Sequence, residues 1–161
     1  MATSLQEYLR TSYRPDCEYV DGTVLERNVG LYDHSRLQGA TGYYYNERRK
    51  DWGTQPLFAQ RIQLSATRVR VPDVCVIIEE PREQVFSTAP LIFIEVLSQD
   101  DRFSEMQDRI HDYLNFGVRY VWILDPARRK AWRCTSDGMH EVSELRTETP
   151  ETLVPLAALF E

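Results

Sequence analysis

The chain has 161 residues, of which 42% are hydrophobic and 27% are charged, a balance typical of a globular domain with a buried core. Its formal net charge of −6 argues against nonspecific nucleic-acid binding through the whole surface. No apolar run approaches the roughly 18 residues of a membrane helix, and no basic and apolar leader typical of secretion precedes the domain, so we expect one cytoplasmic domain over residues 1–161.

The N-terminal part of the chain predicts a helix, a hairpin and a second helix. Residues 3–12 have apolar side chains at helical spacing after a threonine or serine N-cap, which predicts a short helix. The pair Asp21-Gly22 between two short runs with valine and tyrosine predicts a β-hairpin. Residues 32–52 predict a second helix, with Asp33 as its cap and two glycines that weaken it.

The remaining segments predict a mixed sheet. Residues 56–78 predict two strands, whereas the continuous apolar runs of residues 91–98 and 118–125 predict strands buried on both faces. Between them, an apolar stripe that ends at a glycine predicts a helix over residues 102–117, so that a parallel strand pair flanks a helix. The other expected elements are a loop or short helix at 79–90, a hairpin around Asp137-Gly138 and an amphipathic tail at 153–161.

Cysteines and basic stretches carry weaker signals. The three cysteines (Cys17, Cys75 and Cys134) lie too far apart for a zinc spacing and are expected to be buried thiols in a reducing cytoplasm. Two basic stretches either form ordinary strand ends and turns or face phosphate. They contain Arg61, Arg68 and Arg70 in the first, and Arg128, Arg129, Lys130 and Arg133 in the second.

Two acidic residues stand beside or inside apolar strands. Asp73 directly precedes one apolar run, and Glu95 lies inside another. If the strands are neighbours, two carboxylates about 4 Å apart repel by roughly 4 kcal/mol at an effective dielectric constant near 20. Either one carboxyl takes up a proton, or a divalent cation such as Mg²⁺ or Mn²⁺ bridges the two. The alternative is that each is an edge carboxylate or pairs with a nearby arginine.

The pair Pro72-Asp73, followed by a glutamate in the next apolar strand, resembles the pattern of the PD-(D/E)XK nuclease superfamily. Five ordered segments are similar to a bacterial restriction-endonuclease-like family within it: CEYVDGTVLE, RVRVPDVCVI, PLIFIEVLSQDDR, RIHDYLNFGVRYVWILDP and LVPLAALF. The resemblance covers most of the chain. It implies an α/β (α+β) fold in which helices flank a mixed β-sheet, with a magnesium site at one sheet edge.

The resemblance also implies roles for individual residues. Asp73 and Glu95 match the metal ligands, and Glu18 matches a supporting carboxylate in the first hairpin strand. His34, at the start of the second helix, matches a histidine that could meet phosphate or a metal-bound water. The alternatives are an exposed strand residue for Glu18 and a satisfied, partly buried histidine for His34.

The lysine of the superfamily is absent from its usual place. Leu97 stands two residues after Glu95, and the place to which this family has moved the lysine, four residues before Tyr113, holds Arg109. Arginine can bind phosphate and stabilise negative charge, but it is a poor proton acceptor. The alternative is that Arg109 simply pairs with Glu105 along the helix.

These features imply a Mg²⁺- or Mn²⁺-dependent endonuclease that hydrolyses DNA phosphodiester bonds, expected as a homodimer because cutting a duplex needs two sites. The alternative is a catalytically inactive nucleic-acid-binding or assembly module on the same fold, which the replacement of the lysine and the negative net charge motivate. Weaker site candidates are Gln60, Ser98 and Asp101, together with Tyr43, Tyr44 and Tyr45, which stack on bases or fill the core.

Overall fold

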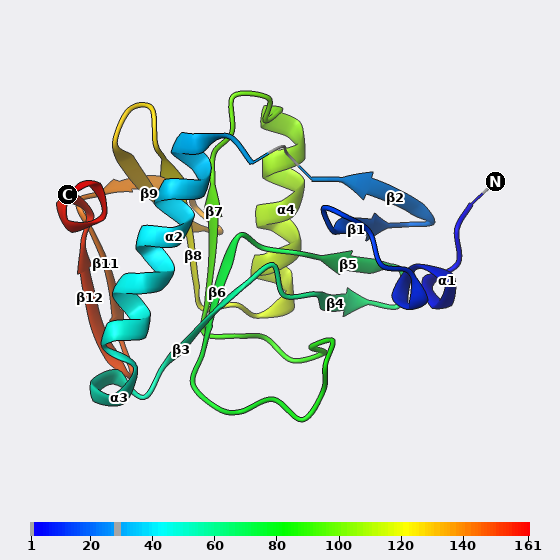
Figure 1. Cartoon of the computed structure of the whole chain (residues 1–161), viewed down its shortest axis with the longest axis horizontal. Helices are drawn as coiled ribbons and strands as arrows, with labels where there is room; N and C mark the ends of the chain where they lie inside the picture. The colour runs from blue at the N-terminus through cyan, green and yellow to red at the C-terminus, as the bar shows by residue number, and fades with distance from the viewer. Residues whose placement is uncertain (1, 28–29) are drawn as a thin grey trace.

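A computed structural model describes residues 2–27 and 30–161, and its largest element is a six-stranded sheet with strand order β10-β9-β8-β7-β6-β3 (Figure 1). β7 and β8 run parallel, and the other neighbours are antiparallel. The predicted mixed sheet with a parallel pair is therefore confirmed. The strands are β3 (Gln55–Phe58), β6 (Val74–Ile77), β7 (Ile92–Val96), β8 (Tyr120–Asp125), β9 (Lys130–Thr135) and β10 (Gly138–Val142).

Helices cover both faces of this sheet. One face packs against α2 (Tyr32–Glu47), and the other packs against α4 (Phe103–Phe116). Because successive side chains of a strand point to opposite faces, Ile94 joins the cluster that contains Leu37 of α2, and Phe93 joins the cluster that contains Tyr113 of α4. Burial on both faces explains the continuous apolar runs.

A smaller sheet lies at the N-terminal end of the molecule (Figure 1). Its order is β2-β1-β5-β4, and Tyr8 of α1 packs with Tyr19 of β1 and Val69 of β5. At the opposite end, a C-terminal hairpin leads into a short 3-10 helix. The remaining elements are α1 (Leu5–Arg10), β1 (Cys17–Val20), β2 (Thr23–Glu26), α3 (Arg49–Trp52), β4 (Ile62–Ser65), β5 (Arg68–Arg70), β11 (Glu144–Glu148), β12 (Glu151–Pro155) and η1 (Leu156–Phe160).

Turn and cap chemistry accounts for the elements that local signals predict. Ser4 caps α1 by accepting a hydrogen bond from the Glu7 backbone at 3.1 Å. Asp21 and Gly22 both have positive φ, 49° and 92°, as a two-residue type I′ hairpin turn requires. Gly117 ends α4 with φ 96°. The expected second hairpin, β9–β10, and the burial of all three cysteines are also confirmed.

Two expectations about local structure are wrong, and one hairpin was not expected. Residues 56–78 form four strands instead of two, because Ala59 at φ 49° interrupts the extended chain and the backbone then leaves the large sheet for the small one. Leu31, not Asp33, is the N-cap of α2, and Asp33 lies in the first turn, where its charge faces the positive end of the helix. The β11–β12 hairpin was not predicted. In the described part of the chain, the helices are too short or too polar to cross a bilayer.

Candidate active site

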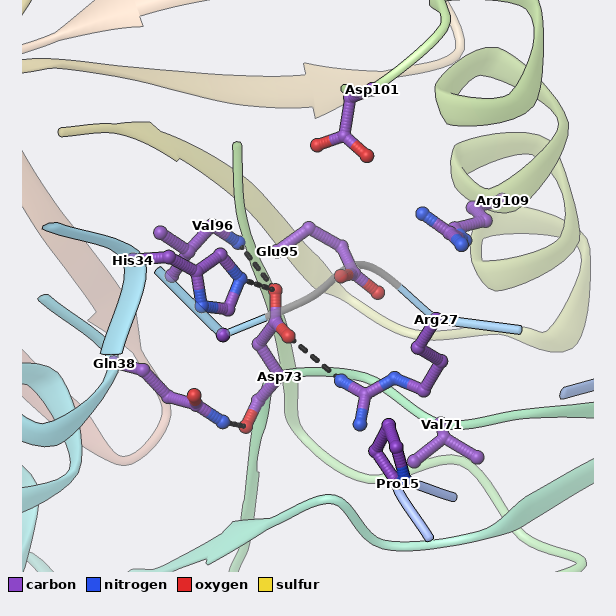
Figure 2. Close-up of a pocket in the computed structure, with 11 residues that line it drawn as sticks. Pro15, Arg27, His34, Gln38, Val71, Asp73, Glu95, Val96, Asp101 and Arg109 are labelled. Carbon is purple, nitrogen blue, oxygen red and sulfur yellow. Dashed lines mark hydrogen bonds and ion pairs between the residues drawn. The ribbon is translucent and has the colours of Figure 1, made fainter. Parts of the chain in front are cut away.

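The two acidic residues that the sequence singled out come together where β6 begins and β7 ends. The antiparallel register pairs Val74 with Ile94, so the next position outward sets Asp73 opposite Glu95. Both side chains are almost fully buried, and both line one cavity of about 170 Å³ (Figure 2). The carboxylates therefore share one space instead of pointing to opposite faces of the sheet.

Asp73 is surrounded by donors. Its Oδ2 accepts a hydrogen bond from the Val96 backbone at 2.8 Å and lies 3.3 Å from His34 Nε2, and its Oδ1 accepts one from Arg27 Nη2 at 2.7 Å (Figure 2). Burial alone would raise the pKa of Asp73, but the hydrogen bond from His34, the positive charges and the Val96 N–H outweigh it and hold the pKa below its usual value. Asp73 is thus an ionised carboxylate. The hydrogen bond to Asp73 in turn raises the pKa of His34.

Glu95 behaves in the opposite way. Burial and the nearby charge of Asp73 raise the pKa of Glu95 well above its ordinary value, against the attraction of Arg109. Its Oε1 accepts a short hydrogen bond from the Tyr113 hydroxyl. The raised pKa of Glu95, which favours its neutral form, and the guanidinium against Asp73 both reduce the repulsion that the sequence predicts. Both features show that positive charge is favoured between the two carboxylates.

Glu18 and Arg109 form an ion pair beside the carboxylates. Glu18 Oε1 accepts hydrogen bonds from Arg109 Nε at 3.0 Å and from Arg70 Nη1 at 3.2 Å, and its Oε2 accepts one from the Val71 backbone at 2.8 Å. The reading of Glu18 as an exposed strand residue is wrong, because it is buried. Arg109 lines the cavity. Its burial alone would lower the pKa of Arg109, but the negative charge of Glu18 outweighs that effect and raises the pKa, so Arg109 stays charged.

The first basic stretch is tied up in internal ion pairs. Arg70 contacts Asp108 at 2.8 Å and Asp112 at 2.9 Å, besides Glu18. Arg68 also contacts Asp112, at 2.7 Å. These arginines hold β5 against α4, and so they are not a free phosphate-facing patch. Arg61 is engaged in the same manner, with Asp16 at 2.6 Å.

Among the weaker candidates, only Asp101 lines the cavity, and its Oδ2 accepts a hydrogen bond from the Ser98 backbone at 2.7 Å. Gln60 donates to the backbone oxygens of Arg61 and Gln84 and lies outside the cavity lining. The three tyrosines of α2 diverge: Tyr43 is exposed, Tyr44 is half-buried and Tyr45 is buried.

Sequence reasoning missed Arg27 and Gln38. Arg27 directly follows β2 and reaches Asp73 across 46 positions of sequence, and Gln38 donates to the backbone oxygen of Asp73 at 2.8 Å. No local pattern marks either residue. Their only signal is their place. Arg27 follows β2, the hairpin partner of the strand that carries Glu18, and Gln38 lies one helical turn after His34.

The donor set decides which cation this site would suit. Within residues 2–27 and 30–161, no three histidine, cysteine or acidic side chains are arranged to hold a metal ion together. Structural zinc usually takes four protein ligands, whereas Mg²⁺ keeps several waters and needs only one or two carboxylates. Asp73 and Glu95 in one cavity therefore fit Mg²⁺ or Mn²⁺, with Arg27 as the group that already occupies Asp73 Oδ1.

The chain was compared with known protein families and solved structures. The model of a family described as "Uma2: Putative restriction endonuclease" matches residues 5–161. Among solved structures, the chain is similar to a putative nuclease belonging to DUF820 from Anabaena variabilis ATCC 29413. The two share 21% identity with a TM-score of 0.85, over 98% of this chain and 97% of that one, which shows a common fold. None of the curated proteins matches the chain.

Proposed function

Since the chain belongs to the Uma2 family, we propose that it is a divalent-metal-dependent endonuclease that hydrolyses DNA phosphodiester bonds. The observation that carries the proposal is the cross-strand placement of Asp73 and Glu95 in one buried cavity. Two buried carboxylates that face each other need a cation or a proton between them. In a phosphodiester hydrolase, the catalytic metal ion would be that cation.

In this proposal the two carboxylates hold the cation and their neighbours hold the carboxylates. The Val96 N–H and His34 fix Asp73, and the Tyr113 hydroxyl fixes Glu95. A magnesium ion bound there would polarise the scissile phosphate and lower the pKa of the attacking water. A cation bound between the two side chains would favour the ionised form of Glu95 as well as that of Asp73.

Arg109 acts on the phosphate and not on the water. Glu18 holds its Nε, which leaves the two terminal nitrogens of the guanidinium to reach the cavity. Arginine does not give up its proton at neutral pH, so Arg109 cannot serve as a general base. It can donate two hydrogen bonds to a phosphate and neutralise the charge that develops in the transition state.

The direct test is incubation of the purified protein with supercoiled plasmid DNA and Mg²⁺ or Mn²⁺. We expect nicked and linear products that disappear when EDTA is added. Because hydrolysis of both strands needs two sites, we further propose a homodimer, which light scattering would detect as twice the 18.9 kDa chain mass. Cleavage that EDTA leaves unchanged would contradict the proposal.

A non-catalytic nucleic-acid-binding or assembly module is the second candidate. The ion pair between Arg27 and Asp73 favours it, since this guanidinium already neutralises the better carboxylate ligand. Calorimetric titration separates the two candidates. Heat of binding at millimolar Mg²⁺ or below supports the enzyme, and its absence together with absent cleavage supports the module.

Arg27→Met should raise the affinity for Mn²⁺ by about 10- to 100-fold, because a hydrogen bond to a charged group contributes about 1.5–3 kcal/mol and the metal would no longer displace it. The measurement is isothermal titration calorimetry. Arg10→Met is the matched control, since Arg10 is exposed at the end of α1 and should leave the affinity unchanged. An unchanged affinity in Arg27→Met would mean that Arg27 does not compete for Asp73.

Arg109→Gln should lower kcat by about 10²- to 10³-fold, as expected for the loss of one positively charged group that stabilises the transition state. Arg109→Lys should keep most of the activity, because a lysine can also neutralise the phosphate. Metal affinity in both variants should stay within about threefold of the original, since Arg109 does not bind the ion. Equal activity of Arg109→Gln and the original protein would remove Arg109 from the mechanism.

A further inference from the structure

A second polar cavity, of about 430 Å³, lies away from the carboxylates. Tyr120, at the start of β8, belongs to the cluster on the α2 face of the sheet, whereas Glu95 points to Tyr113 of α4 on the other face. Tyr120 also pairs with Ile92, three residues before Glu95 on β7, which is roughly 10 Å along the strand. The cavity is lined by Arg119, Tyr120, Arg133, Arg146 and Glu148, which come from β8, β9 and β11 and the residue before β8.

Two of these arginines carry uncompensated charge. The guanidinium carbons of Arg133 and Arg119 lie 5.0 and 5.7 Å from the centre of the Tyr120 ring. Within the described part of the chain, neither side chain forms an ion pair, in contrast to Arg27, Arg61, Arg68, Arg70 and Arg109. On a protein with net charge −6, two neighbouring arginines without acidic partners mark a place that favours an anion.

Unsatisfied hydrogen-bond donors in the cavity also favour an anion there. Arg133 Nε is buried and has no acceptor in the described structure, and a buried donor of this kind calls for a partner. The Tyr120 hydroxyl accepts a hydrogen bond from the Glu148 backbone at 3.1 Å, which leaves its own proton to donate. Arg146 is half exposed and contacts Glu144 at 3.2 Å, so it can turn toward the cavity at little cost.

We propose that this cavity binds a phosphate group. The planar fork of arginine matches the oxygens of a phosphate, and Arg119 and Arg133 outweigh the one acidic side chain of the lining, Glu148. The volume suits a molecule of nucleotide size. The phosphate comes either from a small phosphorylated molecule or from the backbone of a polynucleotide. The proposal does not depend on nuclease activity, because this cavity shares no lining residue with the cavity of the carboxylates.

The test compares two probes, inorganic phosphate and a short single-stranded oligothymidine, titrated calorimetrically in EDTA to prevent cleavage. Arg133→Gln and Arg119→Gln should each weaken binding about tenfold or more, since each removes hydrogen bonds to a charged group. Arg10→Gln, which makes the same change of charge on exposed α1, is the matched control and should bind as the original protein does. Thermal melting checks that each variant is folded. If the half-buried Arg133 cannot be replaced without unfolding, the variant of exposed Arg119 still tests the site.

Each outcome decides the proposal. Weaker binding of inorganic phosphate assigns the site to small phosphorylated molecules, and weaker binding of the oligonucleotide assigns it to a polynucleotide backbone. If neither Arg119→Gln nor Arg133→Gln changes the affinity for either probe, the site does not exist. If Arg10→Gln weakens binding equally, the effect is one of general surface charge, and the proposal also fails.

Discussion

Asp73→Asn should reduce DNA cleavage by about 10³-fold or more. Asparagine has nearly the same shape, so the Val96 N–H can still bond its side-chain oxygen, but the charge that would attract the proposed cation is lost. A metal ion contributes several kcal/mol of charge stabilisation to phosphodiester hydrolysis, and each 1.36 kcal/mol corresponds to a factor of ten in rate. The variant therefore removes the charge of Asp73 while it keeps the packing of the side chain.

The measurement is the initial rate of plasmid cleavage in Mg²⁺, with the affinity for Mn²⁺ determined in parallel by calorimetry. We expect both to fall. Asp51→Asn, in exposed α3, is the matched control and should change neither. Cleavage that survives Asp73→Asn at the original rate would rule out the proposed site, because another set of ligands would then have to hold the metal ion.

Arg70→Met should lower the free energy of unfolding by about 3–5 kcal/mol, the usual cost of removing one partner from a buried ion pair. The Arg70 side chain is 3% exposed and contacts Glu18, Asp108 and Asp112. Its loss would leave Glu18 buried with only Arg109 and one backbone N–H for its charge. The cluster joins both sheets through α4, and so its loss affects the whole fold.

Urea unfolding at neutral pH measures this effect. Arg128→Met removes a 3.7 Å contact between solvent-exposed Arg128 and buried Asp125, and should cost less than about 1 kcal/mol because the Arg128 side chain is mostly in water. The double variant Arg70→Met, Glu18→Gln should be less destabilised than the sum of the two single variants, since the second change removes the unpaired charge. A loss below about 1 kcal/mol for Arg70→Met would show that the other residues of the cluster compensate for it.

The proximity of Asp73 and Glu95 was predictable because both lie at the ends of consecutive apolar strands, and consecutive strands usually pair. The burial of Glu18 was not predictable from its hairpin, because it depends on how β1 packs beside β5 and below α4. Local turn signals such as Asp21-Gly22 could be read directly, since they depend only on neighbouring residues.

The partners of the site residues escaped prediction for the same reason. Arg27 contacts Asp73 only because the fold sets the end of β2 near the start of β6, and no sequence pattern encodes that proximity. The arginines around Tyr120 come from three segments that the fold alone brings together. Leu97 in the usual place of the superfamily lysine and Arg109 on α4 could be found by motif, but the pairing of Arg109 with Glu18 instead of Glu105 could not.

The most direct measurement is the anomalous X-ray scattering of a crystal soaked in Mn²⁺, which locates the ion independently of any activity. We expect one strong peak in the cavity, within coordination distance of carboxylate oxygens from both Asp73 and Glu95, with the Arg27 guanidinium moved off Asp73. A peak elsewhere, or no peak while Arg27 still holds Asp73, would contradict it.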